Sequence, residues 1–192
     1  MNRILLLLGL LSGLALTAPA RAQTRYFTRT GTISFFSATP FEDIQARNQL
    51  VGAVVDVQAG QVAFTVPMKE FKFPKSLMQT HFNENYVESE KYPTATFTGR
   101  LLDFEAAALA GAGPQPVQVA GELSIHGVTR RVQVPGTLEK QGDRLLVRAR
   151  FPVAPADYRI EIPALVRDHI AKSVDVTVAL TCEPLPLLSS LK

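Results

Sequence analysis

Residues 49–68 read QLVGAVVDVQAGQVAFTVPM, two apolar runs separated by a short break. In the second run Val62, Phe64 and Val66 alternate with smaller or more polar residues, a period of two that is typical of a strand with one buried face. The break ends in Gly60, and glycine readily adopts the positive φ that a tight hairpin needs. This stretch therefore predicts an antiparallel hairpin.

Six further stretches place β-branched or aromatic residues at alternate positions, as expected for half-buried strands. They cover residues 30–37, 94–101, 117–125, 128–137, 144–153 and 173–181. A second hairpin break is Gln141-Gly142-Asp143. Eight strands are enough to close a barrel, whose interior is either filled by side chains or holds one small ligand. We predict an all-β fold, a single antiparallel β-barrel of about eight strands.

Three other segments complete the expected layout. Residues 41–46 follow Pro40 and have Glu42 and Asp43 in their first turn, and residues 74–85 run from Pro74 to Asn85, so both segments predict short helices. Residues 106–116 are small, uncharged and rich in glycine and proline, and they predict a surface loop.

The N-terminus has the pattern of an export signal. Arg3 precedes the apolar run 4–16, and Ala20-Arg21-Ala22 offers small residues for cleavage between Ala22 and Gln23. A membrane anchor is the alternative, but the run is shorter than the roughly 20 residues that span a bilayer. We expect residues 1–22 to be a signal peptide, residues 23–192 to form one domain with its core at about 28–183, and the protein to be periplasmic or secreted.

Composition excludes several classes of function. The 192 residues include 20 Lys and Arg against 17 Asp and Glu, a formal net charge of +3 without a basic block, so nucleic-acid binding has no support. Cys182 is the single cysteine, which precludes an intramolecular disulfide, and we interpret it as a small strand residue. The three histidines have no metal-ligand spacing, and no nucleophile or phosphate-binding motif is present. We therefore predict no catalytic residue, no metal and no cofactor beyond a bound lipid.

Residues 77–93 differ from the strands around them because they combine histidine, asparagine, tyrosine and several acids. This segment is either a lid at the mouth of the barrel or a connection whose Phe82, Tyr86 and Tyr92 cap one end of the core. Aromatic side chains usually bury a large area, which favours the cap.

Two strings carry a family resemblance: THFNENYVESEKYPTATF at 80–97 and GELSIHGVTRRV at 121–132. Their order and spacing resemble the YceI family. The resemblance implies a lipocalin-like barrel, often a homodimer, with an apolar channel for a polyisoprenoid, quinone-like or fatty-acid-derived lipid. The sequence departs from the family pattern at residues 40–48 and at Arg159, where relatives commonly have glycine; Arg159 is expected to narrow or charge that end of the barrel.

The resulting hypothesis is a non-enzymatic carrier or store for one apolar lipid, with transient membrane contact. Inward-facing positions give the expected lipid-binding wall: Ile33, Phe35, Val62, Phe64, Val66, Phe97, Leu123, Ile125, Val147, Phe151 and Tyr158. Candidates for contacting a polar head group are His81, Tyr86, Tyr92 and His126. Two alternatives stay open: an envelope interaction module with a filled barrel, and a hydrolase or isomerase using His81 or His126 with a nearby carboxylate.

Overall fold

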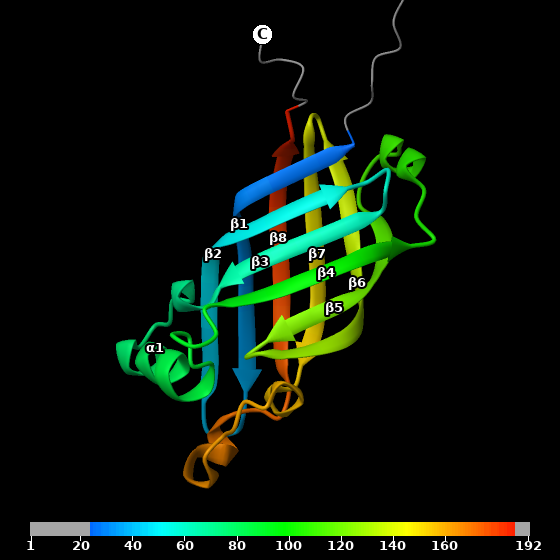
Figure 1. Ribbon diagram of the computed structural model, residues 1–192. Helices are drawn as coiled ribbons and strands as arrows, with labels where there is room; N and C mark the ends of the chain where they lie inside the picture. The colour runs from blue at the N-terminus through cyan, green and yellow to red at the C-terminus, as the bar shows by residue number, and fades with distance from the viewer. Residues whose placement is uncertain (1–23, 187–192) are drawn as a thin grey trace, which may run out of the picture.

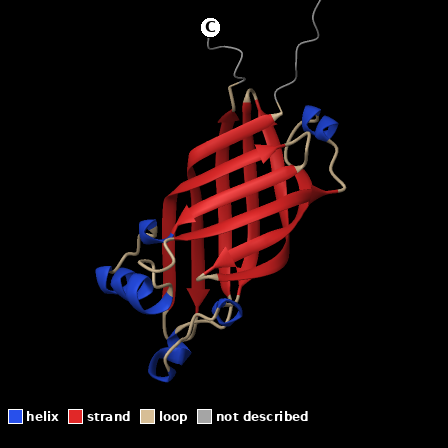
Figure 2. Ribbon diagram, viewed as in Figure 1, coloured by secondary structure: helices blue, strands red, loops and turns tan. Residues whose placement is uncertain are grey.

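The computed structural model describes residues 24–186, so the predicted signal peptide and its cleavage site between Ala22 and Gln23 lie outside the described residues. Eight strands form a closed barrel in chain order (Figures 1 and 2). They are β1 (Arg25–Ala38), β2 (Asp43–Asp56), β3 (Gln61–Pro67), β4 (Thr94–Leu102), β5 (Gln115–Ile125), β6 (Val128–Gln141), β7 (Arg144–Val153) and β8 (Val174–Pro184). The predicted fold class is confirmed.

Each strand pairs antiparallel with the next, and β1 closes the barrel against β8 through pairs such as Ile33 with Val178 and Phe35 with Val176. The β1–β2 register shifts near Gly31, where the long strands bend. At this bend Asn48 is fully buried, and its side chain is satisfied on both sides. Its Nδ2 donates to the Pro67 carbonyl at 2.7 Å, and its Oδ1 accepts from the Leu50 amide at 2.8 Å. The bond to Pro67 holds β2 against the end of β3, where the connection to β4 begins.

The two ends of the barrel differ in their connections. At the mouth end, defined by the β1–β2, β3–β4, β5–β6 and β7–β8 connections, lie α1 (Ser76–His81) and the short helices η1 (Met68–Glu70), η2 (Phe82–Tyr86), η4 (Pro155–Tyr158) and η5 (Ala164–His169). At the closed end, the β4–β5 connection carries η3 (Ala106–Ala110). Figure 1 shows α1 and the two helices after β7 gathered at the mouth end and η3 opposite. None of the helices within residues 24–186 combines the length and apolar composition that a membrane crossing requires.

The helix predicted over 74–85 is present as α1 followed by the π-helical turn η2. The helix predicted over 41–46 is wrong, because β2 begins at Asp43 and pairs with the end of β1. The Thr39 hydroxyl accepts from the amides of Phe41 and Glu42, so the proline and acidic residues form a tight turn instead. The predicted surface loop 106–116 is interrupted by η3, and its last two residues belong to β5.

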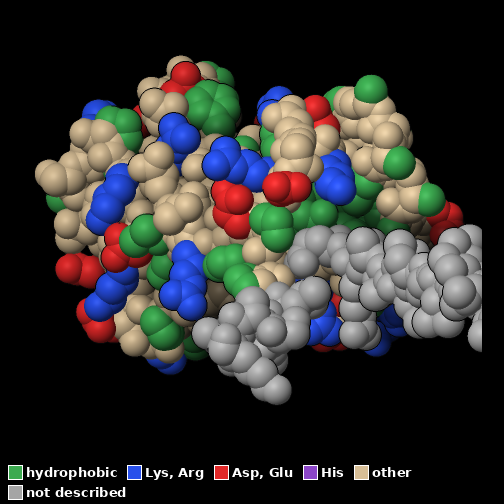
Figure 3. All heavy atoms as spheres, turned by 90° about the horizontal axis from the view of Figure 1, so that it is seen from above, with side chains coloured by type: hydrophobic (Ala, Val, Ile, Leu, Met, Phe, Trp, Pro, Cys, Tyr) green, Lys and Arg blue, Asp and Glu red, His purple; other side chains and the backbone are tan. Residues whose placement is uncertain are grey.

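The core is packed most completely at the closed end. Tyr26, Val55, Leu138, Leu145 and Cys182 are almost entirely inaccessible to solvent there. Seen from this end, basic and acidic side chains are intermixed over the visible surface (Figure 3). The mouth half of the barrel is not filled in the same way, and that difference defines the site.

Candidate ligand-binding site

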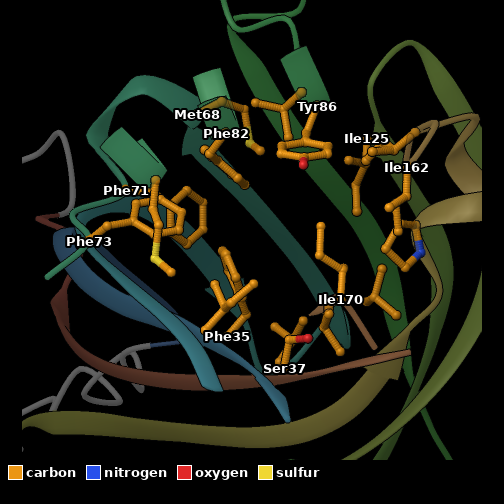
Figure 4. A pocket seen from close by; sticks show the side chains of 18 of the residues that line it. Phe35, Ser37, Met68, Phe71, Phe73, Phe82, Tyr86, Ile125, Ile162 and Ile170 are labelled. Atoms are coloured by element: carbon orange, nitrogen blue, oxygen red, sulfur yellow. The ribbon is translucent and has the colours of Figure 1, made fainter. Parts of the chain in front are cut away.

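A cavity of about 370 Å³ occupies the mouth half of the barrel, and we call it the outer cavity. Its size falls in the range of small-ligand pockets. Its lining is mainly apolar and comes from the strands and from the β3–β4 and β7–β8 connections at the mouth end (Figure 4). The lining residues not predicted from sequence include Met68, Phe71, Phe73, Met78, Phe82, Ile160, Ile162, Val166, Ile170 and Val174.

Four phenylalanines form one wall of the outer cavity. Phe35 on β1 contacts Phe71, Phe73 and Phe82, with ring centroids 5.5, 5.8 and 5.6 Å apart. Phe73 and Phe82 are also in contact, at 5.1 Å. Such tilted and stacked arrangements are favourable, so this group holds the connection after β3 against the barrel.

Few polar groups reach the outer cavity. The Ser37 hydroxyl, buried at its edge, accepts from the Ala171 amide at 2.9 Å. Glu42 pairs with Lys75 at 3.0 Å on the mouth side. Burial raises the pKa of Tyr86 above its ordinary value, and Figure 4 shows the Tyr86 hydroxyl directed toward the enclosed space. These groups suit one polar end of an otherwise apolar molecule.

A second, inner cavity of about 90 Å³ lies deeper in the barrel. Ile33, Val66, Ala95, Leu123 and Phe151 line both cavities. The interior is therefore hollow in two adjoining parts, which disagrees with the filled barrel that the interaction-module hypothesis requires.

All but one of the predicted wall residues line at least one cavity. Phe35 and Ile125 line the outer cavity, and Val62, Phe64, Phe97 and Val147 line the inner cavity. Tyr158 lines neither and is buried in η4. The prediction that Tyr158 lines the cavity is wrong. Tyr158 lies in a connection, where the alternation of a strand does not indicate which way a side chain points.

The four head-group candidates divide into two pairs. His81 and Tyr86 line the outer cavity. Tyr92 and His126 line neither cavity, and their rings contact each other edge to face with centroids 4.5 Å apart. Phe82 and Tyr86 of the segment 77–93 thus cover the outer cavity, and Tyr92 packs the same segment against His126 of the barrel.

His126 has a carboxylate partner, as the enzyme hypothesis requires, but not in a catalytic setting. Its Nε2 lies 2.7 Å from Oε2 of Glu88, and its Nδ1 lies 3.1 Å from the Tyr158 carbonyl oxygen. Both ring nitrogens are therefore engaged, and the imidazole does not face the cavity. His81 is exposed, and its side chain makes no hydrogen bond or ion pair within residues 24–186.

Two other sequence expectations concern single residues. Arg159 is exposed, lines neither cavity and has φ 55°, so it does not narrow or charge the barrel; its left-handed backbone explains why glycine suits this position. Cys182 is buried on β8, and burial raises the pKa of its thiol to about 12, as befits a structural cysteine. Within residues 24–186 no group of three or more His, Cys, Asp or Glu side chains is placed to hold a metal ion.

The fold and the cavities place the chain among the small antiparallel barrels with a hollow interior. Residues 21–182 match the YceI-like domain model, so the chain belongs to the YceI-like domain family, which confirms the resemblance seen in the sequence. A search of curated proteins found no match.

Solved structures share the fold at low sequence identity. A polyisoprenoid binding domain from Saccharophagus degradans has a TM-score of 0.71 and 19% identity, covering 85% of this chain and all of that one. BcnA of Burkholderia cenocepacia has a TM-score of 0.63 and 16% identity over 79% of this chain and 95% of its own. The YceI protein of Campylobacter jejuni has a TM-score of 0.58 and 11% identity over 71% and 82%.

Proposed function

We propose that this protein binds one apolar lipid of the polyisoprenoid type inside the barrel and acts as a non-enzymatic carrier or store. The observation that carries the proposal is the outer cavity of about 370 Å³, which is almost wholly apolar and adjoins the inner cavity. Burying a methylene group contributes about 0.8 kcal/mol, so an apolar chain can bind without strong polar contacts. The Saccharophagus domain, which is named for polyisoprenoid binding, supports the choice of lipid class.

The ligand enters, in this proposal, at the mouth end during transient contact with a membrane. Three large apolar side chains are exposed there: Phe41 in the β1–β2 connection, Leu77 in α1 and Leu165 in η5. Exposed apolar side chains around a cavity mouth favour contact with an apolar surface. The predicted signal peptide supports a periplasmic or secreted site of action, and the N-terminal sequence of the exported protein tests the expected cleavage before Gln23.

An enzymatic role is not proposed. The one histidine with a hydrogen-bonded carboxylate, among the described residues, is His126, and both of its ring nitrogens already have partners. A base that takes a proton from a substrate must reach that proton, and His126 does not line the cavity.

The test is native mass spectrometry of full-length protein expressed in a host with an envelope, followed by organic extraction and identification of the bound molecule. We expect one apolar lipid per barrel. The same spectrum reports the oligomeric state and so tests the predicted homodimer.

The matched variants are Ile125→Glu and Phe36→Glu. Ile125 lines the outer cavity near its mouth, whereas Phe36 points outward from β1. A charge in the cavity wall opposes an apolar ligand, so Ile125→Glu should lose the lipid while Phe36→Glu keeps it. A wild-type protein that is empty and also fails to take up added polyprenols, quinones or fatty amides would contradict the proposed function.

A further inference from the structure

Five residues line both cavities and form the boundary between them, which we call the passage. Four of them are large apolar residues: Ile33, Val66, Leu123 and Phe151. The fifth is Ala95, which is buried on β4 and has the smallest side chain of the group. The boundary therefore has its smallest side chain at Ala95.

The ring of Phe97 lies flat against the barrel wall beyond this passage. Gly99 and Gly121 face each other across β4 and β5. A Cβ atom at Gly99 would lie 2.6 Å from Cζ of Phe97, and one at Gly121 would lie 2.8 Å from the same atom. The ring thus occupies space that only a pair of glycines leaves free. It also stacks on Phe64, with centroids 5.8 Å apart and the ring planes 29° from parallel.

The inner cavity ends against the packed half of the barrel. Val55 and Leu138 line it and are themselves fully buried. Leu145 and Cys182, farther toward the closed end, are also fully buried. A chain that passes Ala95 and Phe97 therefore meets a close-packed core, whose displacement would cost contacts on all sides.

We propose that Ala95 and Phe97 set the maximum length of the apolar chain that the barrel accepts, because the inner cavity receives the last carbons of that chain. This inference rests on the proposed function. Ala95 admits the chain to the inner cavity, and Phe97 limits the room it finds there. Both are specificity-determining positions for chain length.

The experiment is a binding series of linear 1-alkanols of increasing length, measured by calorimetry on the folded wild-type barrel. Each added methylene should tighten binding about fourfold until the chain reaches the end of the inner cavity. Beyond that length the gain should stop, and the position of this limit is the quantity to compare between variants.

Ala95→Leu and Phe97→Ala should move the limit in opposite directions. Leucine at position 95 fills the passage, so the gain should stop at a shorter chain. Removal of the Phe97 ring enlarges the inner cavity, so the gain should continue to a longer chain. The controls are Ala63→Leu and Phe36→Ala, which make the same changes at exposed positions on β3 and β1 and should leave the limit unchanged.

Circular dichroism establishes that each variant retains the barrel, and Phe97→Leu serves if Phe97→Ala does not fold. The glycine pair is unsuited to this test, because a Cβ at Gly121 would lie 2.3 Å from the Thr98 carbonyl oxygen and would disturb strand pairing. An unchanged limit in both folded cavity variants would overturn the inference alone. If the wild type bound no alkanol of any chain length, both this inference and the proposed function would be overturned.

Discussion

The imidazole of His126 is hydrogen-bonded to the carboxylate of Glu88, with Nε2 and Oε2 2.7 Å apart. The two residues are 38 positions apart in the chain. Glu88 belongs to the connection between β3 and β4, and His126 to the turn between β5 and β6. Since Nδ1 of the same ring lies 3.1 Å from the Tyr158 carbonyl oxygen, one side chain joins three segments at the mouth end.

Removing this ring should lower stability. The His126 side chain is only 11% exposed, so His126→Ala removes the partly buried contacts of both ring nitrogens, with the Glu88 carboxylate and the Tyr158 carbonyl oxygen. We expect the free energy of unfolding to fall by about 1–3 kcal/mol, measured by urea denaturation. His169→Ala is the control, because His169 is more exposed and its Nδ1 lies 3.9 Å from Glu42. Equal stability of the two variants would show that the His126 bonds contribute nothing.

The turn that carries His126 depends on its glycine. Gly127 has φ 72°, and a Cβ there would lie 2.6 Å from Cε1 of Tyr92. Gly142, in the β6–β7 turn, has φ 59° and no atom within 4 Å of such a Cβ. Gly142→Ala should therefore cost about 1–2 kcal/mol of backbone strain, and Gly127→Ala should cost more because a ring must also move. Thermal unfolding of the two variants gives the comparison, and a Gly142→Ala loss equal to or larger than that of Gly127→Ala would refute it.

Two tyrosines offer a matched test of the head-group site. Tyr86 lines the outer cavity, whereas Tyr92 packs on His126 outside it. Tyr86→Phe should weaken binding of a prenyl alcohol by about two- to tenfold, the equivalent of one hydrogen bond, and Tyr92→Phe should not. Calorimetric dissociation constants for the alcohol and for a hydrocarbon of equal length separate the polar contact from packing. Equal effects on both ligands would argue against a head-group role for Tyr86.

The Cys182 thiol should be unreactive in the native protein. Burial holds its pKa at about 12, above its ordinary value of 9.0, so about one molecule in ten thousand carries a thiolate at pH 8. Labelling with a thiol reagent at pH 8 should be slow in buffer and fast in denaturing urea. Rapid labelling of the folded protein would show that β8 opens or that the thiol is accessible.

The same raised pKa predicts a direction for stability at high pH. Below pH 9 the thiol is protonated in both states, but between pH 9 and about 12 the unfolded chain loses the proton first. Stability should therefore fall as pH rises through this window, by up to about 1.4 kcal/mol per pH unit from this group. Cys182→Ala should have a shallower fall in urea denaturation than the wild type. Parallel pH profiles would remove the thiol as the cause.

Apolar side chains at the mouth should speed lipid uptake from membranes. Leu165 is 92% exposed and Leu77 is 65% exposed, so replacing both with serine should cost little stability. We expect the double variant to extract a fluorescent polyprenol from phosphatidylcholine vesicles about tenfold more slowly, since it loses two side chains that would insert into the bilayer. Leu50→Ser, on the outer face of β2, is the control. Equal extraction rates would count against membrane contact at this end.

The strands were predictable because alternation is a local property. Val62, Phe64 and Val66 share a face in any strand with one buried side, so the period of two in the sequence was sufficient to assign them to the interior. The error at residues 41–46 arose because pairing with β1 outweighed a weak local preference for a helix turn. The family could also be assigned from two short strings, since the histidine and Tyr-Pro pair of the first and the two glycines of the second occur in the order of the family pattern.

The amino-acid sequence by itself determined the barrel, the number of strands and most of the inward-facing wall. The tertiary structure alone decided that the closed end is packed while the mouth half is hollow, since the same apolar residues can fill space or surround it. It also decided that Phe71 and Ile170 reach the cavity whereas Tyr158 and His126 do not. These residues lie in connections or turns, where no periodic pattern fixes direction and where contacts between segments distant in sequence set the position of each side chain.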